Sequence, residues 1–294
     1  MTKKNKILIL GASGMLGSAV FRSFHNSPSY EVVGTVRSSS SLRYFTAAQQ
    51  PALLPNIDVL DADALVSLFG QVRPDIVINC VGLVKQLSSV KDPLVTLPLN
   101  SLLPHRLARI AALSHARLIH ISTDCVFSGA EGGYTEESQS DATDLYGISK
   151  YLGEVTSYDN AVTLRTSIIG RELASAHSLI DWFLKQESEV KGFDKAIFSG
   201  LPTCELALVI RDFVIPTPSL KGLYHVSAKP ISKYKLLQLV ATEYKKTIKI
   251  LKDEQFMIDR SLDSTKFTNA CGYNAPDWPE LIQRMHNDDS RGDQ

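Results

Sequence analysis

Tyr146 and Lys150 lie four residues apart and carry side chains suited to proton transfer. Residues at positions i and i+4 of a helix share one face, so a helix here would bring the two side chains together. An ammonium beside a phenol favours the phenolate and lowers its pKa from an ordinary value near ~10. Such a tyrosine exchanges a proton with a carbonyl oxygen near neutral pH. Because the same spacing also occurs on solvated helix faces, the surrounding elements must decide between the two interpretations.

A glycine-rich loop near the start of the chain is the first of these elements. Residues 6–10 form an apolar run, residues 11–17 carry three glycines, and residues 18–24 have helical spacing. This order predicts a strand, a tight turn and a helix, in which glycines let a pyrophosphate approach the backbone and the helix N-terminus offers N–H donors. An ordinary turn between strand and helix is the alternative. The residues predicted to contact a dinucleotide are Gly11, Ser13, Gly14, Met15, Leu16 and Gly17.

The end of the second predicted strand, residues 30–36, indicates the type of dinucleotide. It is followed by Arg37 and by four serines, residues 38–41, where NAD-binding proteins of this type place an acidic residue for the ribose 2′-hydroxyl. An arginine at this position favours a 2′-phosphate and predicts NADP(H), with NAD(H) as the second choice. A solvated loop arginine is the alternative interpretation.

The next elements continue an alternation of strands and helices. We expect a short third strand at residues 56–59, a helix at 61–69 capped by Asp61, a central strand within 75–82, a helix at 97–113 and a fifth strand at 117–122. Asn100, inside the second of these helices, is either a functional residue or a plain polar one. The cofactor contacts predicted along this stretch are Asp58, Val59, Cys80, Val81 and Gly82, of which Asp58 borders the adenine or is a structural loop residue.

The pair Tyr146 and Lys150 falls in a predicted helix at residues 144–154, before a sixth strand at 162–165. Further helices are expected at 179–185, 204–214, 232–244 and 278–285, strands at 222–226 and 248–250, and a polar tail at 287–294. The pattern predicts an α/β fold, a Rossmann-type doubly wound parallel sheet with a smaller C-terminal α/β substrate domain. Residues 1–170 would bind NADP, with a return segment near 204–228, and residues 171–294 would mainly bind substrate.

Composition excludes several other classes of protein. Lys and Arg number 31 and Asp and Glu number 31, so the net charge of zero gives no reason to expect nucleic acid as a partner. No apolar run approaches the ~20 residues of a membrane span. The four cysteines are far apart and lack metal-ligand spacing, so we expect no metal site and a reduced, cytoplasmic setting.

The motifs together resemble a known family over nearly the whole chain. Residues 11–17, 122–129, 146–154, 164–167, 222–226 and 277–278 are similar to extended short-chain dehydrogenase/reductases, and within them to the dTDP-4-dehydrorhamnose reductase group. The resemblance implies that Thr123 polarises a keto oxygen, that Tyr146 is the acid, and that Lys150 is its activator and also holds the nicotinamide ribose. It implies substrate contacts at Lys85, Asp124, Val126, Phe127, Thr166, Ser167, Trp182 and Arg260.

The function implied is NADPH-dependent reduction of the 4-keto group of a 6-deoxy nucleotide sugar, for the synthesis of surface polysaccharide sugars. Residues 80–86 and 260–264 depart from the family pattern where the sugar nucleotide is expected. The alternatives are therefore a UDP-linked N-acetylated 4-keto-6-deoxy sugar, a nucleotide-sugar 4-epimerase, or a dinucleotide-binding regulatory subunit. The partner expected is the nucleotide sugar, and whether the chain forms a homodimer stays open.

Overall fold

The computed structural model describes residues 4–83, 85 and 88–292, which form two compact units. The first unit comprises Met1–Ser122, Asp144–Leu164 and Pro218–Leu223, and the second comprises Thr123–Thr143, Arg165–Thr217 and Tyr224–Gln294. The chain passes between the units several times. Val84 and Gln86, which belong to the stretch that departs from the family pattern, lie outside the described residues.

The first unit is built on a seven-stranded sheet in the order β11-β6-β5-β4-β1-β2-β3. Its strands are β1 Asn5–Leu10, β2 Tyr30–Thr35, β3 Leu53–Leu54, β4 Ile76–Asn79, β5 Arg117–Thr123, β6 Ala161–Thr166 and β11 Gly222–His225. β1 lies inside the sheet and pairs in parallel with both β2 and β4, so the sheet is wound outward in two directions from it. The predicted Rossmann-type, doubly wound fold is therefore confirmed.

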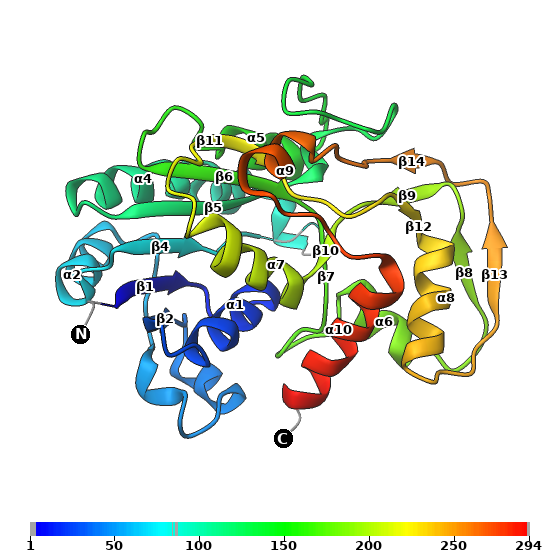
Figure 1. Cartoon of the computed structure of the whole chain (residues 1–294), viewed down its shortest axis with the longest axis horizontal. Coiled ribbons are helices and arrows are strands. Elements are labelled where there is room, and N and C mark those ends of the chain that lie inside the picture. The colour runs from blue at the N-terminus through cyan, green and yellow to red at the C-terminus, as the bar shows by residue number, and fades with distance from the viewer. Residues whose placement is uncertain (1–3, 84, 86–87, 293–294) are drawn as a thin grey trace. The chain divides into compact units, whose positions relative to one another are not determined.

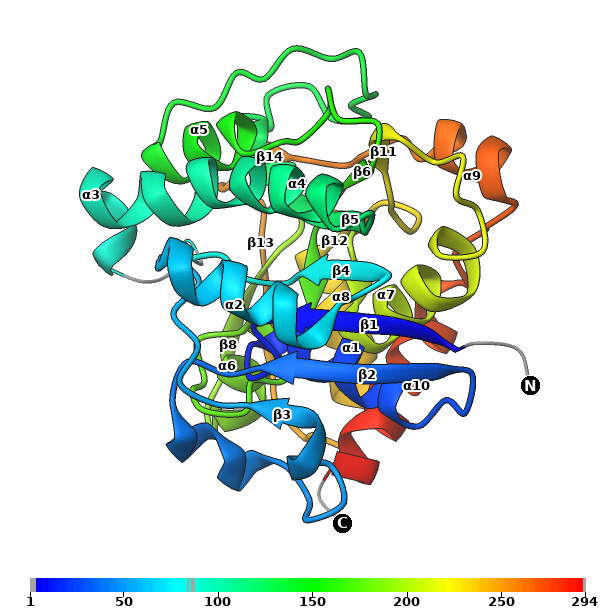
Figure 2. The same ribbon diagram turned by 90° about the vertical axis from the view of Figure 1, so that its left-hand side faces the viewer.

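Helices cover the sheet because the central strands are apolar on both faces. Leu8 and Leu10 of β1 face α2 and α4 in one hydrophobic cluster, and Ile7 and Ile9 point to the opposite face, as the two-residue period of a strand requires. Figure 2 shows α2 and α4 across the face of the sheet that is turned to the viewer. The helices of this unit are α1 Met15–His25, α2 Ala62–Val72, α3 Pro93–Thr96, α4 Leu103–Leu113 and α5 Leu145–Leu152.

Side-chain caps fix where two of these helices begin. The first residue of each helix was predicted to within one position. Asp61 accepts hydrogen bonds from the backbone N–H groups of Asp63 and Ala64, so α2 begins at the next residue. Asp144 caps α5 by accepting from the N–H of Gly147 at 2.8 Å. The helix expected at residues 97–113 is present, but its first turns are a π-helical segment, Leu97–Leu102.

The third strand was predicted in the wrong place. It is Leu53–Leu54, paired with Gly34 and Thr35, whereas residues 56–59 form an irregular turn. Asn56 has a left-handed backbone with φ of 60°, and the carboxylate of Asp58 accepts the N–H of Leu60 at 2.9 Å. Both features bend the chain away from an extended conformation, so the apolar Ile57 and Val59 do not mark a strand.

The second unit combines short strands with helices, as the α/β prediction requires. Its strands are β7 Ile168–Ile169, β8 Val190–Phe193, β9 Ala196–Phe198, β10 Leu201–Pro202, β12 Ile231–Ser232, β13 Ile250–Asp253 and β14 Ile258–Asp259. They pair in the orders β10-β7, β12-β9-β14 and β13-β8. Its helices are α6 Leu179–Lys185, α7 Thr203–Val209, α8 Lys233–Glu243, α9 Thr265–Cys271 and α10 Trp278–Gly292. In Figure 1, α8 lies beside β8 and β13.

Two predictions in this unit are corrected by the structure. The strand expected at residues 248–250 is β13, and it lies mainly after them, because Ile250 to Asp253 pair with Val190 to Phe193 of β8. The tail expected at residues 287–294 is helical as far as Gly292. Asp289 in that stretch accepts a hydrogen bond from the hydroxyl of Tyr244, the residue directly after α8, so this carboxylate has a partner in the fold.

Candidate active site

The glycine loop has the geometry of an anion-binding turn. Gly11 has φ of +80°, in the region that favours glycine, and its N–H and that of Ala12 are held by Thr35 at the end of β2. Gly14 is the N-cap of α1, is exposed, and places no capping side chain over the first turn. The leading N–H groups of an eleven-residue helix are thus left for a ligand, which fits the predicted pyrophosphate site.

The carboxyl end of β4 lies against this loop and against α5. A Cβ built on Gly11 would lie 2.9 Å from Cγ2 of Val81, and the N–H of Cys80 donates to Leu10 O at 3.1 Å. A Cβ on Gly82 would lie 3.8 Å from Nζ of Lys150. Burial raises the pKa of the Cys80 thiol to about 12, so this thiol stays protonated near neutral pH. The structure therefore brings the predicted contacts at residues 80–82 together with the loop and with Lys150.

Arg37 and Asp58 are found at the neighbouring edge of the same sheet. The N–H of Ile57 donates to Val36 O at 3.3 Å. Arg37 follows Val36 and Asp58 follows Ile57, so Arg37 and Asp58 are also neighbours. Both side chains are exposed, and Val59 between Asp58 and α2 is buried. The Arg37 guanidinium makes no hydrogen bond or ion pair within residues 4–83, 85 and 88–292, which leaves its donors available to a ligand.

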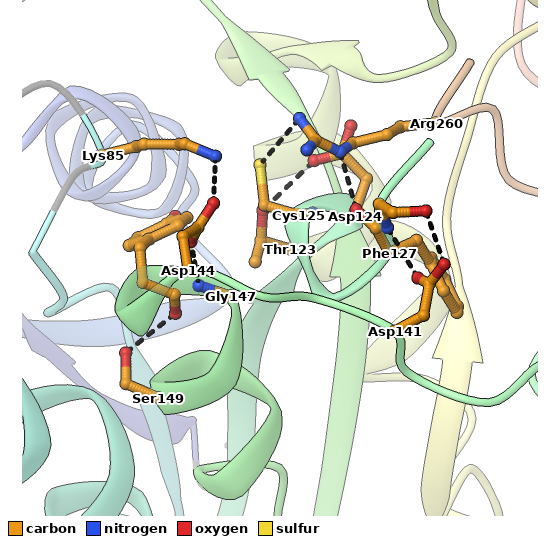
Figure 3. Close-up of polar contacts among 12 residues, drawn as sticks. Lys85, Thr123, Asp124, Cys125, Phe127, Asp141, Asp144, Gly147, Ser149 and Arg260 are labelled. Atoms are coloured by element: carbon orange, nitrogen blue, oxygen red, sulfur yellow. Dashed lines mark hydrogen bonds and ion pairs between the residues drawn. The ribbon is translucent and has the colours of Figure 1, made fainter. Parts of the chain in front are cut away.

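Tyr146 and Lys150 both lie on α5, one turn apart, as the sequence predicts. Lys150 is 6% exposed, and its Nζ donates to the carbonyl oxygen of Ile121 in β5 at 2.8 Å. At the start of the helix, Lys85 Nζ binds the capping carboxylate of Asp144 at 2.5 Å (Figure 3). These contacts fix both ends of the short helix on which the proposed acid is carried.

Burial of Lys150 sets its protonation. Desolvation lowers the pKa of this ammonium to about 8, and the nearby carboxylate of Glu154 acts in the opposite direction. Glu154 is itself buried and accepts a hydrogen bond from the Ser122 hydroxyl at 2.8 Å. Near neutral pH the lysine is still charged, so it can favour the phenolate of a tyrosine on its helix.

The cost of this buried charge gives a prediction about stability. The folded pKa of Lys150 lies below its unfolded value near 10.5, so the folded state binds fewer protons between about pH 8 and 10.5. Burial of the charged Lys150 lowers the free energy of unfolding by its full amount below pH 8. This destabilisation disappears as the pH rises from about 8 to 10.5, because the unfolded state loses its proton there. Lys150→Met should therefore raise the free energy of unfolding at pH 7 by about 1–3 kcal/mol while abolishing activity. Urea unfolding of the parent and the variant at pH 7 and at pH 10 measures the difference in the free energy of unfolding at each pH, and this difference should be smaller at pH 10.

Lys91→Met, at an exposed lysine, serves as the control and should change the free energy of unfolding by less than about 0.5 kcal/mol. A Lys150→Met variant less stable than the parent at pH 7 would show that the bond to Ile121 outweighs the desolvation cost.

Asn100 is a buried residue whose role the sequence left undecided. It lies in the π-helical segment and is buried, its Oδ1 accepts the N–H of Leu83 at 3.0 Å, and its Nδ2 donates to Ser149 Oγ at 3.1 Å. A Cβ on Gly153 would lie 1.9 Å from Asn100 O, so the two helices touch through their backbones. Asn100 therefore positions α5 and the loop after β4. A helical hydrophobic pattern carries no signal for a π-turn.

In the second unit, polar groups gather at the turn that follows β5. The Thr123 hydroxyl donates to Asp124 Oδ1 at 3.2 Å, and the buried Asp124 carboxyl has a pKa raised by burial and held back by Arg260. Arg260 Nε donates to Phe127 O at 2.7 Å, and its Nη1 lies 3.9 Å from Cys125 Sγ (Figure 3). The predicted substrate contacts Asp124 and Arg260 are thus brought together beside the hydroxyl predicted to polarise a carbonyl.

The other predicted substrate contacts of this unit differ in how much of their side chains is exposed. Val126 and Phe127 are fully buried in a cluster with Tyr134 and Leu262, and Phe127 stacks on Tyr134 with ring centroids 4.1 Å apart. Neither offers surface to a ligand in this structure, since core packing uses their side chains. Thr166 is buried at the end of β6, Ser167 is among the groups that hold back the rise in the pKa of Asp124, and Trp182 on α6 is 40% exposed.

The described part of the chain shows no trio of His, Cys, Asp or Glu side chains arranged to hold a metal ion. None of its helices is both long and apolar enough to cross a lipid bilayer.

Comparisons with known proteins agree with this arrangement. The sequence pattern of the family called RmlD substrate binding domain matches residues 5–290. Methionine adenosyltransferase 2 subunit beta of Xenopus laevis is 27% identical over 259 residues, which are 81% of this chain and 72% of that protein. A probable low-salt glycan biosynthesis reductase, Agl14 of Haloferax volcanii, is 31% identical over 168 residues, 55% of this chain and 52% of the other.

Among solved structures, dTDP-4-dehydrorhamnose reductase of Bacillus anthracis, in complex with NADP, superposes with a TM-score of 0.80. It is 21% identical, and the match covers 97% of this chain and 100% of the other. This likeness confirms the fold, and the family match spans nearly all of the sequence. The chain belongs to the RmlD substrate binding domain family.

Proposed function

We propose that the protein is an NADPH-dependent reductase of the 4-keto group of a 6-deoxy nucleotide sugar. The observation that carries this proposal is the buried ammonium of Lys150, on the same short helix as Tyr146 and 3.8 Å from a Cβ position on Gly82. A protein that only binds a dinucleotide has no need of a buried charge on the helix of a tyrosine acid. Two similar proteins that are named as reductases support the reaction class.

Each side chain has a separate task in this proposal. When bound, NADPH supplies the hydride that is transferred to C4 of the sugar. The Gly11–Gly17 backbone and the first turn of α1 hold its pyrophosphate, and Lys150 holds its ribose. Thr123 donates a hydrogen bond to the keto oxygen, and Tyr146 gives that oxygen its proton, with Lys150 lowering the pKa of the phenol.

Preference for NADPH over NADH rests on Arg37. A guanidinium offers a planar set of donors to a 2′-phosphate, and a charge-assisted bond is worth about 1.5–3 kcal/mol. Because Arg37 is exposed, we take the lower limit and expect Arg37→Ala to reduce kcat/KM with NADPH by roughly tenfold while leaving that with NADH nearly unchanged. Arg43→Ala, at an exposed arginine nearby, is the matched control. Equal use of both cofactors by the parent protein would mean that Arg37 only faces solvent.

The identity of the sugar is tested by a substrate screen. Purified protein is incubated with NADPH and either dTDP-4-dehydrorhamnose or UDP-linked N-acetylated 4-keto-6-deoxy sugars, and oxidation is followed at 340 nm. We expect turnover with the dTDP-linked substrate. Turnover only with a UDP-linked sugar would move the proposal to the second substrate class, and isomerisation with NAD alone would indicate a 4-epimerase.

A regulatory subunit is the second candidate, because relatives named methionine adenosyltransferase 2 subunit beta match 81% of the chain. Tight NADPH binding in calorimetry, together with no oxidation of NADPH in the presence of any 4-keto sugar, would favour a regulatory subunit.

We also propose a cytoplasmic homodimer. Tyr151 and Leu152, half-exposed on α5, supply apolar surface for such a contact, and a monomer mass in light scattering would contradict it.

A further inference from the structure

His225, the last residue of β11, is a buried histidine that the proposed reaction does not use. Its ring bridges two stretches of the second unit, because Nδ1 lies 3.0 Å from Tyr134 O and Nε2 lies 3.3 Å from Nη1 of Arg165 in β6. A carbonyl oxygen only accepts hydrogen bonds and a guanidinium only donates them. Nδ1 therefore carries the ring proton and Nε2 is bare, so the bridge requires one neutral tautomer of His225.

The surroundings of His225 keep its ring neutral. Burial lowers the pKa of the imidazole to about 4, and the charge of Arg165 acts in the same direction. The bond to Tyr134 O and the carboxylate of Asp263 oppose this shift without reversing it. Because none of its side chain is exposed, His225 acts through the residues that it holds and not on a ligand.

Both partners of His225 contact the ring of Phe127. The guanidinium of Arg165 lies over this ring, 5.2 Å from its centre, which is a cation–π distance. Tyr134 stacks on the same ring with centroids 4.1 Å apart. The backbone of Phe127 is held as well, since its carbonyl oxygen accepts Arg260 Nε at 2.7 Å (Figure 3). The bridge through His225 thus fixes the two groups that clamp Phe127.

The turn that carries Thr123 ends at Phe127. Residues 124–126 form a short 3₁₀ helix, in which the Thr123 hydroxyl accepts the N–H of Cys125 at 3.2 Å and the N–H of Phe127 donates to Asp124 O at 3.0 Å. Since only three residues separate them, a fixed Phe127 also fixes the backbone of Thr123. The three stretches of the second unit begin at residues 123, 165 and 224, so this cluster joins all three.

We propose that His225 and Arg165 are positioning residues for Thr123. The bridge between them clamps Phe127 and thereby sets the direction in which the Thr123 hydroxyl points. The inference rests on the proposed function only for the carbonyl oxygen that this hydroxyl would meet. A donor displaced by about 1 Å costs an enzyme roughly 10²-fold in rate, so a rigid turn at Thr123 has a direct use in the reaction.

The test compares two amide side chains at position 225 in the full-length protein. His225→Asn is still able to donate to Tyr134 O but is too short to accept from Arg165. His225→Gln is one methylene longer and is able to accept from Arg165, while Tyr134 O keeps the N–H of Asp263 at 2.8 Å. The two variants therefore differ in the contact on which the proposal depends.

Hydrogen–deuterium exchange reads the order of the turn without any turnover. We expect the backbone N–H groups of Cys125 and Phe127 to exchange at least about tenfold faster in His225→Asn, the effect of losing one buried hydrogen bond, and within about threefold of the parent in His225→Gln. The N–H of Val190, bonded at 3.0 Å at the start of β8 in the same unit, is the reference and should not change. Arg165→Met removes the other half of the bridge and should act as His225→Asn does.

Unchanged exchange at Cys125 and Phe127 in His225→Asn and Arg165→Met would overturn the proposal. Equally faster exchange at Val190 would also overturn it, because the bridge would then only stabilise the unit as a whole. Arg211→Met, at an arginine that pairs with its neighbour Asp212, is the control and should leave all three N–H groups unchanged.

Kinetics adds a second measurement in the reductase assay. His225→Asn should lower kcat by roughly ten- to a hundredfold with the KM for NADPH unchanged, and should cause no further fall when combined with Thr123→Ala, because both changes remove the same contact. Effects that multiply in the double variant would contradict a role through Thr123. Failure of the parent to reduce any 4-keto sugar would refute only the proposed reaction, since the exchange measurement decides the positioning role by itself.

Discussion

Replacing Tyr146 by phenylalanine is expected to lower kcat for the 4-keto sugar by roughly 10²–10⁴-fold, the usual contribution of a general acid. The substitution removes one hydroxyl and keeps the ring, so α5, capped by Asp144 and tied to β5 through Lys150, should keep its position. NADPH affinity should change by less than about twofold, because Lys150 and the glycine loop are intact. Steady-state kinetics and calorimetric titration of the purified variant measure the two effects separately.

Tyr151→Phe is the matched control, since Tyr151 is on the same helix and is 47% exposed. It should keep parental turnover. If Tyr146→Phe also turns over within a few-fold of the parent, the assignment of Tyr146 as the acid is wrong.

Gly14→Val should abolish dinucleotide binding while leaving the fold intact. A Cβ on Gly14 meets only Gly11 O, at 3.4 Å, so the turn itself accepts a side chain. The branched side chain would instead stand over the first turn of α1, where the pyrophosphate must reach backbone N–H groups. We expect the Kd for NADPH to rise at least a hundredfold, with a circular dichroism spectrum and melting temperature close to those of the parent.

Gly17→Ala separates this effect from simple damage to the loop. A Cβ on Gly17 would lie 2.0 Å from Gly11 O, so the strand and helix must move apart and the melting temperature should fall. NADPH affinity retained in Gly14→Val would show that the loop is only a turn between β1 and α1.

The sequence was informative where a local rule determines the structure. Asp61, Asp144 and Ser232 were expected to begin or cap helices, and their side chains do so, because capping depends on a few neighbouring residues. The strand–glycine–helix order likewise predicted β1 and α1, and the alternation of elements predicted the sheet. Boundaries that depend on distant pairing were not predicted, as β3 and β13 show.

The residues of the candidate site likewise divide into those that the sequence reveals and those that only the structure reveals. Tyr146, Lys150 and the glycine loop are recognisable from spacing, and the structure places Gly82 beside Lys150. Asn100 owes its position to a π-turn, which a helical hydrophobic pattern does not reveal. The role of such residues follows only from the folded structure.

Strands β5, β6 and β11 begin in the first unit and end in the second, and the second unit is assembled from three separate stretches of chain. Arg117 at the start of β5 also bonds Leu220 O at 3.0 Å, which draws residues 218–223 back into the first unit. A single genetic crossover therefore cannot exchange one whole unit between relatives. Changes confined to the second unit arise instead by substitution within the shared scaffold, or by recombination events that exchange several segments together.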